Sequence, residues 1–405
     1  MQKNFSLKPN IDWLIWLSIW ITNQFIPIAG NENFFITKNG DSLSYLAVAK
    51  FCQGVMPTDP VVFQHAQRFF VPCVVGKLDQ LTHLGIENIA RGFTFFISLL
   101  SILGFRAILK KLGVNHALAT LSVVFLVFNP YLFRLYNSMP LQLIDVSFVC
   151  AMIFSIYGLL TKSSRVFWVS FALCALTRQT AVLLLIPFAY YFFKINTPVR
   201  NAKFNSTLLA LIFFFGFVIG KSFALKISGP NHNHEHFLGL GVWMRDSFNV
   251  REGIEFLIRA FIPFIGLLLL YLVWMKKKSH FTLSKFEPQD QKIALWLFVT
   301  GLFLMTQPLL GGPVIVAHAV ARLMAYSVVP LLLLVTLLLD RSHVINSLGE
   351  SQKGILWIAP VLISFHHIYT YNSGQSSDLS FRYALNSVVV LIVSAILIWK
   401  ENTES

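Results

Sequence analysis

Charged residues are scarce along this chain. Only 12% of its 405 residues are Asp, Glu, Lys or Arg, against roughly 25% in soluble domains. Hydrophobic residues make up 56% of the chain, which includes 39 phenylalanines, and the mean hydropathy is +0.66. Such a chain could not cover a water-exposed surface with charge, so the composition favours a protein that crosses a membrane several times.

The sequence also lacks the motifs of several enzyme classes. It contains no Walker A sequence, no GxGxxG in a strand context and no GxSxG, so nothing indicates ATP, NAD or a serine-hydrolase triad. Its four cysteines show neither CxxC nor zinc-site spacing. Cys52 and Cys73 share one loop and can form a disulfide if that loop faces an oxidising compartment, but free thiols fit at least as well.

Apolar runs about as long as a membrane-spanning helix, roughly 20 residues, recur throughout the chain. They predict an all-α fold, a polytopic transmembrane bundle of about 10–12 segments that forms a single integral membrane domain over residues 1–405. The expected segments are 11–29, 91–109, 116–133, 141–160, 166–176, 179–193, 206–226, 256–275, 293–310, 319–339, 354–371 and 383–399. The stretch 166–193 can be one long helix or a hairpin of two short segments with Arg178 near its tip.

Basic residues decide between these two topologies. The net charge of +14 arises mostly in short loops between apolar runs, a pattern that reflects membrane orientation rather than nucleic-acid binding. With a cytoplasmic N-terminus, the later basic loops remain inside only if 166–193 is a hairpin. The charge pattern therefore predicts cytoplasmic termini and two long outer loops, at about 30–90 and 227–255, which make the extracytoplasmic side the working face.

The first outer loop holds the leading catalytic candidate, Asp41. Gly40 permits a turn, and residues 42–52 predict a short helix lying at the membrane interface with Asp41 near its start. A carboxylate there can serve as a general base toward a hydroxyl, or hold a divalent metal such as Mg or Mn. The structural alternative is a helix cap. Asp59, between Thr58 and Pro60, is typical of a turn and is at most a supporting residue.

Two arginines are candidates for binding a substrate phosphate. Arg68 precedes FFVP, where it either clamps a phosphate or anchors the loop at the interface. His65 lies three residues earlier and Tyr45 lies in the expected interfacial helix, so both are supporting candidates. Arg178 is flanked by apolar residues, which makes it a functional hypothesis by default, with a structural ion pair or helix cap as the alternative.

Further phosphate-binding candidates lie in later segments. The second outer loop contains alternating histidines, His232, His234 and His236, whose spacing matches no standard zinc signature, so contact with substrate phosphates is the preferred interpretation. Arg322 follows His318 by four residues, which places both on one helical face. An Arg and a His on a face that lines a cavity suit an anionic head group, whereas interfacial anchoring is the alternative.

Four short pieces together resemble the glycosyltransferase C superfamily of polytopic membrane enzymes. They are GDSLSYL (40–46), RFFVP (68–72), ALTRQTAVLLLIP (175–187) and ARLMAYSVVP (321–330). The resemblance is to a bacterial branch. It implies a cell inner membrane enzyme that moves a sugar from a polyprenyl-phosphate donor to a glycan, lipid or protein acceptor outside the cytoplasm. Asp41 matches the family's catalytic base or metal ligand, but it stands in GDS without the paired acids of many members, so the need for a metal stays open.

Two other functions compete with this interpretation. A transporter or flippase for an anionic lipid or sugar phosphate would also arrange arginines and kinked helices around a cavity. Against it, the sequence shows no inverted repeat and its polar residues collect on one face. A non-catalytic assembly partner is the third alternative, and it predicts that no single polar residue is essential.

Overall fold

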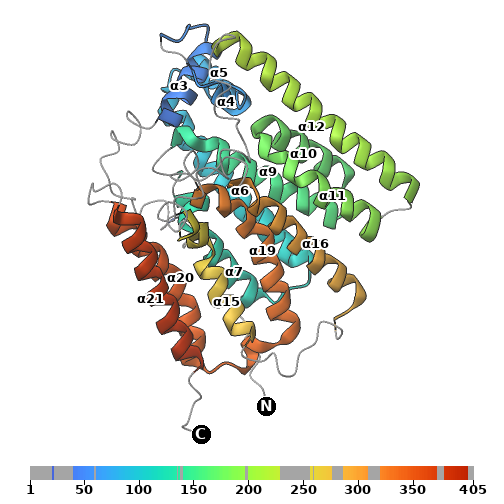
Figure 1. The fold of residues 1–405 in the computed structure, drawn as a ribbon, viewed down its shortest axis with the longest axis vertical. Coiled ribbons are helices and arrows are strands. Elements are labelled where there is room, and N and C mark those ends of the chain that lie inside the picture. The colour runs from blue at the N-terminus through green and yellow to red at the C-terminus, as the bar shows by residue number, and fades with distance from the viewer. Residues whose placement is uncertain are drawn as a thin grey trace. The chain divides into compact units, whose positions relative to one another are not determined.

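The computed structural model of the chain describes residues 21, 40–58, 61–134, 136, 140–196, 199–228, 256–258, 260–275, 286–308, 320–371 and 378–399. Within these ranges the chain forms helices and their connections, without a strand (Figure 1). Five of the described helices are long and apolar enough to cross a membrane. The predicted all-α polytopic bundle is confirmed, and the fold indicates a membrane protein.

The predicted apolar segments within the described ranges are helical over most of their length. The main α-helices are α3 (Gly40–Cys52), α4 (Phe63–Ala66), α5 (Phe70–Thr82), α6 (Ile86–Lys111), α7 (His116–Val127), α9 (Leu143–Leu160), α10 (Ser164–Thr177), α11 (Leu185–Tyr191), α12 (Val199–Ser228), α15 (Ile265–Met275), α16 (Pro288–Met305), α19 (Val320–Ser342), α20 (Glu350–Tyr371) and α21 (Asp378–Trp399). Short 3-10 turns and π turns connect several of them, including η3 (Gln179–Leu184) and η4 (Phe192–Asn196). The first predicted segment, 11–29, lies outside the described residues except for Ile21.

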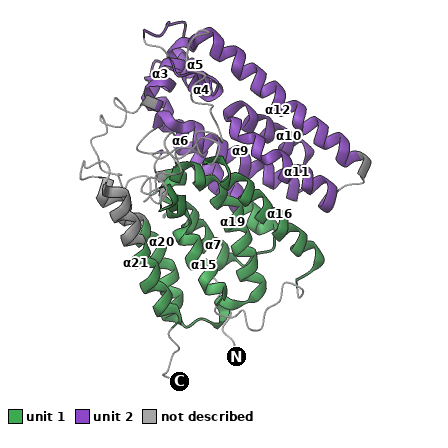
Figure 2. Ribbon diagram, in the orientation of Figure 1, with its two compact units in different colours: residues 1–29, 106–134, 240–405 green, residues 30–105, 135–239 purple. Residues whose placement is uncertain are grey.

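The chain divides into two compact units (Figure 2). Unit 1 comprises residues 1–29, 106–134 and 240–405, and unit 2 comprises residues 30–105 and 135–239. The described part of the first predicted outer loop folds into α3, α4 and α5 within unit 2, whereas almost all of the second lies outside the described residues. That both units act as one integral membrane domain stays a prediction.

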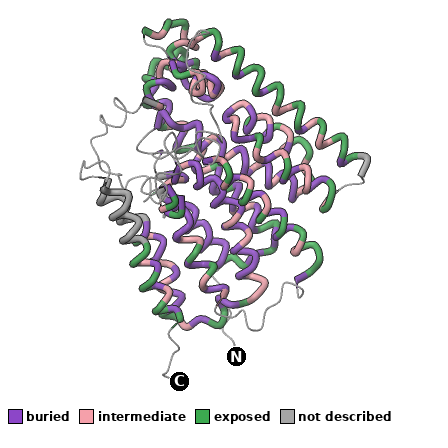
Figure 3. The backbone as a smooth tube through the Cα atoms, viewed as in Figure 1, coloured by how far each residue is buried: buried purple, intermediate pink, exposed green. Residues whose placement is uncertain are grey.

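In unit 2, α9 is the central helix and α12 is the outer one. Within their most apolar windows, 83% of the α9 segment is buried but only 22% of the α12 segment (Figure 3). The exposed side chains of α12 include Phe204, Phe214 and Phe215. An exposed apolar face of this length would be unfavourable in water but matches lipid, so α12 is oriented as a membrane helix would be.

The predicted hairpin within 166–193 is confirmed. At Arg178 the backbone becomes extended (φ −149°, ψ 142°), which ends α10. The chain then returns antiparallel, since the ring of Phe167, near the start of α10, lies 5.6 Å from that of Phe188 and 5.5 Å from that of Phe192. The 14 residues of α10 span only about 21 Å at 1.5 Å per residue. This length is less than the roughly 30 Å of a bilayer core.

Small residues let α12 approach its neighbours closely. Gly216 and Gly220 form a GxxxG pattern. A Cβ atom at Gly220 would lie 2.7 Å from the carbonyl oxygen of Gln67, and one at Gly216 would lie 3.1 Å from the Cβ of Ala175. Such contacts stabilise helix packing in membranes through van der Waals interaction, and they hold the segment after α4 against α12.

In unit 1, α19 is the buried helix, with 89% of its most apolar window covered, and α16 and α15 pack along it. Arg341, near its end, donates to Asp290 (2.7 Å), Asp340 (2.6 Å) and the carbonyl oxygen of Leu112 (2.7 Å). These bonds bring the start of α16, the end of α19 and the loop after α6 to the same end of the unit. The sequence-based topology predicts the same grouping of these three segments.

Candidate active site

The short helix predicted over residues 42–52 is present as α3, with Asp41 in its first turn, and its position at a membrane interface stays a prediction. A disulfide between Cys52 and Cys73, whose Cα atoms are 5.2 Å apart, joins α3 to α5. The two helices touch so closely that a Cβ atom at Gly76 would collide with the backbone of Ala49. The helix that carries Asp41 is therefore fixed both covalently and by packing.

The short helix α4 brings His65 to Asp41. The Nε2 atom of His65 lies 3.2 Å from Oδ1 of Asp41. The imidazole also packs beside Tyr45 of α3, with ring centroids 5.2 Å apart. The side chain of Asp41 is 27% exposed and that of His65 14% exposed, so the carboxylate is the more accessible member of this pair.

Arg68 follows in the turn after α4, where its backbone N–H donates to the carbonyl of His65 at 3.0 Å. Its Nη1 donates to the Tyr45 hydroxyl at 2.9 Å, and its Nε donates to Oε1 of Gln179 at 3.2 Å. Both side-chain partners are uncharged, and the structure gives Arg68 no carboxylate partner within the described ranges. Because a guanidinium carries five N–H donors, Arg68 retains both charge and donors for an anion. The Asp41 cluster is hereafter Asp41, Tyr45, His65, Arg68 and Gln179.

Arg178 has a different environment from Arg68. It is 3% exposed and forms an ion pair with Asp145, which is also 3% exposed. The hydroxyl of Tyr136 donates to the second oxygen of Asp145 at 3.0 Å. The structure thus shows the structural ion pair that was the alternative interpretation of Arg178. A substrate phosphate would have to compete with Asp145 for this guanidinium, so its predicted role in phosphate binding gains no support from the pairing.

A small cavity lies beside Arg178 and Gln179. It is lined by Gln67, Arg178, Gln179 and the close-packed face of α12 around Gly216 and Gly220, and its volume is about 10 Å³. Such a volume suits roughly one water molecule. Gln179 connects Arg68 to Gln67. Its Oε1 accepts from Arg68, and its amide nitrogen donates to Oε1 of Gln67 at 2.8 Å.

The remaining sequence candidates lie in unit 1 or outside the described residues. Arg322 is half-buried on α19 of unit 1, and its role in phosphate binding stays a prediction. The others lie outside the described residues: Asp59, His232, His234, His236 and His318. Among the residues that the structure describes, no group of three or more metal-ligating side chains occurs, and a metal at Asp41 also stays a prediction.

Sequence reasoning missed Asp145, Tyr136, Gln67 and Gln179. Asp145 carried a readable signal, because an acid within the apolar segment 141–160 requires a partner. Arg178 was the matching cation. The two glutamines carried none, since neutral polar residues beside helix ends have many uses.

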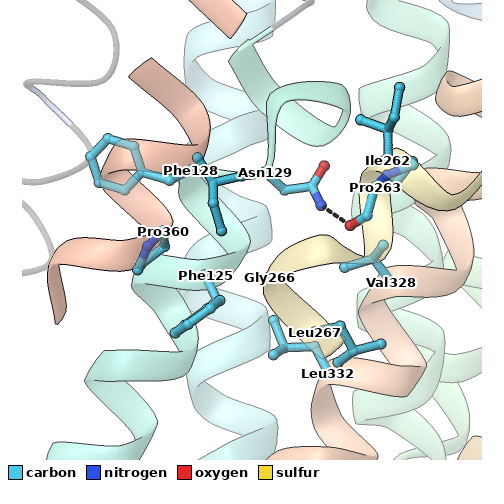
Figure 4. A pocket seen from close by; sticks show the side chains of 11 residues that line it. Phe125, Phe128, Asn129, Ile262, Pro263, Gly266, Leu267, Val328, Leu332 and Pro360 are labelled. Carbon is cyan, nitrogen blue, oxygen red and sulfur yellow. Dashed lines mark hydrogen bonds between the residues drawn. The ribbon is translucent and has the colours of Figure 1, made fainter. Parts of the chain in front are cut away.

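A second small cavity lies within unit 1 (Figure 4). Its walls are mostly apolar, with Phe125 and Leu332 among them, and its volume is about 20 Å³. The Nδ2 atom of Asn129 donates to the carbonyl oxygen of Pro263 at 2.8 Å, and its Oδ1 accepts from the backbone N–H of Tyr131 at 3.1 Å. Asn129 therefore satisfies backbone groups where α7 ends, and its amide serves the fold.

Comparisons with protein families, with curated proteins and with solved structures find no match to this chain.

Proposed function

We propose that the chain is a membrane glycosyltransferase that transfers a sugar from a polyprenyl-phosphate donor, with Asp41 as the general base. The observation that carries the proposal is the 3.2 Å pairing of a partly exposed carboxylate with His65, one turn from Arg68. An acid–base pair beside a cation without a described acid partner suits a reaction that removes a proton and releases a phosphate.

Each member of the cluster has a role in this reaction. The acceptor hydroxyl gives its proton to Asp41 as its oxygen forms a bond to the anomeric carbon. The bond from that carbon to the donor phosphate breaks, and its electron pair leaves with the polyprenyl phosphate. His65 donates Nε2–H to Asp41 and orients the carboxylate, and Arg68 binds the departing phosphate through charge-assisted hydrogen bonds.

The disulfide and the basic residues support an extracytoplasmic position for the cluster. Disulfides persist in oxidising compartments, and the Cys52–Cys73 bond joins α3, the helix that carries Asp41 and Tyr45, to α5. Lys162, Arg165 and Lys194 lie near the ends of α9, α10 and α11 that are farther from Arg178. By the positive-inside rule those ends face the cytoplasm, which agrees with a cell inner membrane enzyme whose termini are cytoplasmic and whose active face is outside.

The test is transfer of radiolabelled sugar from polyprenyl-phosphate donors to a membrane-extract acceptor by the purified protein in liposomes. Asp41→Asn should lower transfer by about 100-fold or more, the usual effect of losing a general base. Glu87→Gln, which removes an exposed acid from the same predicted outer loop, is the matched control and should leave transfer unchanged. A chelator arm tests the Mg or Mn alternative at Asp41. Full transfer by Asp41→Asn would disprove the assignment.

A transporter for an anionic lipid or sugar phosphate is the second candidate. The buried ion pair of Arg178 and Asp145 favours it, because ionisable pairs inside apolar helices often mark transport paths. The same liposomes distinguish the two functions. Label that crosses the membrane while its bond to phosphate stays intact would support transport, whereas label that appears on the acceptor would support the transferase.

A further inference from the structure

A region rich in basic residues lies in unit 1, where α6 ends and α7 begins. A surface cavity of about 350 Å³ is lined there by Arg106, Lys110, Asn115 and His116, with small residues between them. Its volume lies within the range of small-molecule sites. The basic pocket is built from residues of unit 1, whereas the Asp41 cluster is built from residues of unit 2.

The groups around the basic pocket favour an anion. Lys110 and His116 are exposed, and Arg106 is half-buried with Nη1 3.4 Å from the Thr120 hydroxyl. The pocket also contains the N-terminus of α7, which Asn115 caps by accepting the N–H of Ala117 at 2.9 Å. The positive end of the helix dipole adds to the charge of the side chains.

The nearby acid does not cancel this positive field. Asp340 accepts the backbone N–H of Asn115 at 2.9 Å, but its other carboxylate oxygen is paired with Arg341 at 2.6 Å. Arg341 in turn also binds Asp290. Both acids, Asp340 and Asp290, are therefore turned toward Arg341. The basic side chains that line the pocket itself are those of Arg106, Lys110 and His116.

The position of the pocket on α6 indicates what kind of anion it takes. α6 is one of the five helices that can span a membrane, and it ends at Lys111. The exposed side chains of Phe96, Leu100 and Leu103 follow one another at helical spacing toward Arg106. An apolar stripe that ends at basic residues matches a molecule with a phosphate and an apolar tail.

We propose that the basic pocket binds the phosphate of an anionic phospholipid, whose acyl chains lie along α6. Arg106 and Lys110 pair with the phosphate oxygens, and the N-terminus of α7 supplies backbone dipoles. Inorganic phosphate shares this chemistry but lacks the tail, so it provides the distinguishing arm. The phosphate site lies in unit 1, the apolar stripe lies on the part of α6 that belongs to unit 2, and the proposal does not depend on the glycosyltransferase assignment.

The test measures lipid retention by the full-length protein in zwitterionic detergent, using native mass spectrometry. Phosphatidylglycerol, phosphatidylcholine with the same chains and inorganic phosphate are titrated separately, and phosphate is also added as a competitor. The pocket variant is Arg106→Gln with Lys110→Gln. The control is Arg165→Gln with Lys194→Gln, which removes two exposed basic side chains from unit 2.

The pocket variant should bind phosphatidylglycerol roughly 20-fold more weakly, as expected for two lost phosphate contacts, and the control should change by less than about twofold. Since Arg106 is half-buried, Lys110→Gln with His116→Gln provides a second variant confined to exposed residues, and it too should weaken binding. Equal losses in pocket and control variants, or equal retention of phosphatidylcholine, would overturn the proposal. An affinity for inorganic phosphate equal to that for phosphatidylglycerol would overturn it as well, because the tail would then contribute nothing.

Discussion

Two arginines of unit 2 flank the same glutamine and yet differ in what their charge can do. Arg68 is half-buried and donates to Tyr45 and Gln179, both neutral. Arg178, the residue just before Gln179, is almost fully buried and paired with Asp145. The first arrangement positions a guanidinium without neutralising it, and the second neutralises it and joins α9 to the hairpin.

The difference follows from burial. Inside an apolar bundle an isolated charge is strongly unfavourable, so Arg178 is stable there only with a buried carboxylate that is itself hydrogen-bonded, here by Tyr136. A half-exposed arginine keeps part of its hydration and needs no acid. Whether an arginine can bind a substrate anion therefore depends on whether its guanidinium is already paired with a carboxylate.

The largest effect is expected from breaking the Arg178 pair. Asp145→Asn leaves a buried guanidinium uncompensated and should lower the free energy of unfolding by about 3–5 kcal/mol. Thermal unfolding of the purified protein in detergent measures this loss as a lower Tm. The double variant Asp145→Leu with Arg178→Met removes both charges and should recover most of the stability. If the double variant stays as unstable as Asp145→Asn, Arg178 does more than balance Asp145.

Arg68→Gln should show the opposite pattern. Removing this cation should lower sugar transfer by about 10²–10³-fold, as expected for one lost stabiliser of a leaving phosphate, and should change Tm little because its partners are neutral. Arg68→Lys keeps the charge but cannot contact Tyr45 and Gln179 at the same time. Its activity should therefore lie between that of the unchanged protein and that of Arg68→Gln. A large fall in Tm with Arg68→Gln would instead make Arg68 a structural residue like Arg178.

The sequence was sufficient for features that depend on local pattern and charge. Apolar runs located the helices, the charge distribution predicted the hairpin that breaks at Arg178, and Gly40 with Asp41 marked the start of α3. These properties are readable because helix length and basic loops obey constraints that the membrane imposes on each segment separately.

Features that depend on pairing across the chain were not readable. Asp145 and Arg178 lie in different segments, and the contact of Arg68 with Gln179 spans 111 positions. The spacing of Cys52 and Cys73 allowed free thiols or a disulfide, and only the packing of α3 on α5 decides between them. Which apolar face turns inward depends on neighbouring helices, so the division into two units also followed from the structure alone.

The smallest effect is expected from Tyr45→Phe, which sharpens the contrast by altering only how Arg68 is positioned. Tyr45 is 3% exposed, and its ring packs beside His65 while its hydroxyl accepts from Arg68. The variant keeps the ring and loses one hydrogen bond, a change of about 0.5–1.5 kcal/mol. Transfer should fall by roughly 3- to 10-fold with Asp41 and His65 intact. The loss should appear mainly as a higher KM for the donor, because in the proposed mechanism Arg68 binds the donor phosphate. Tyr271→Phe, at an exposed position in unit 1, is the control. A fall as large as that of Arg68→Gln would mean that the Tyr45 hydroxyl itself contacts the reacting atoms.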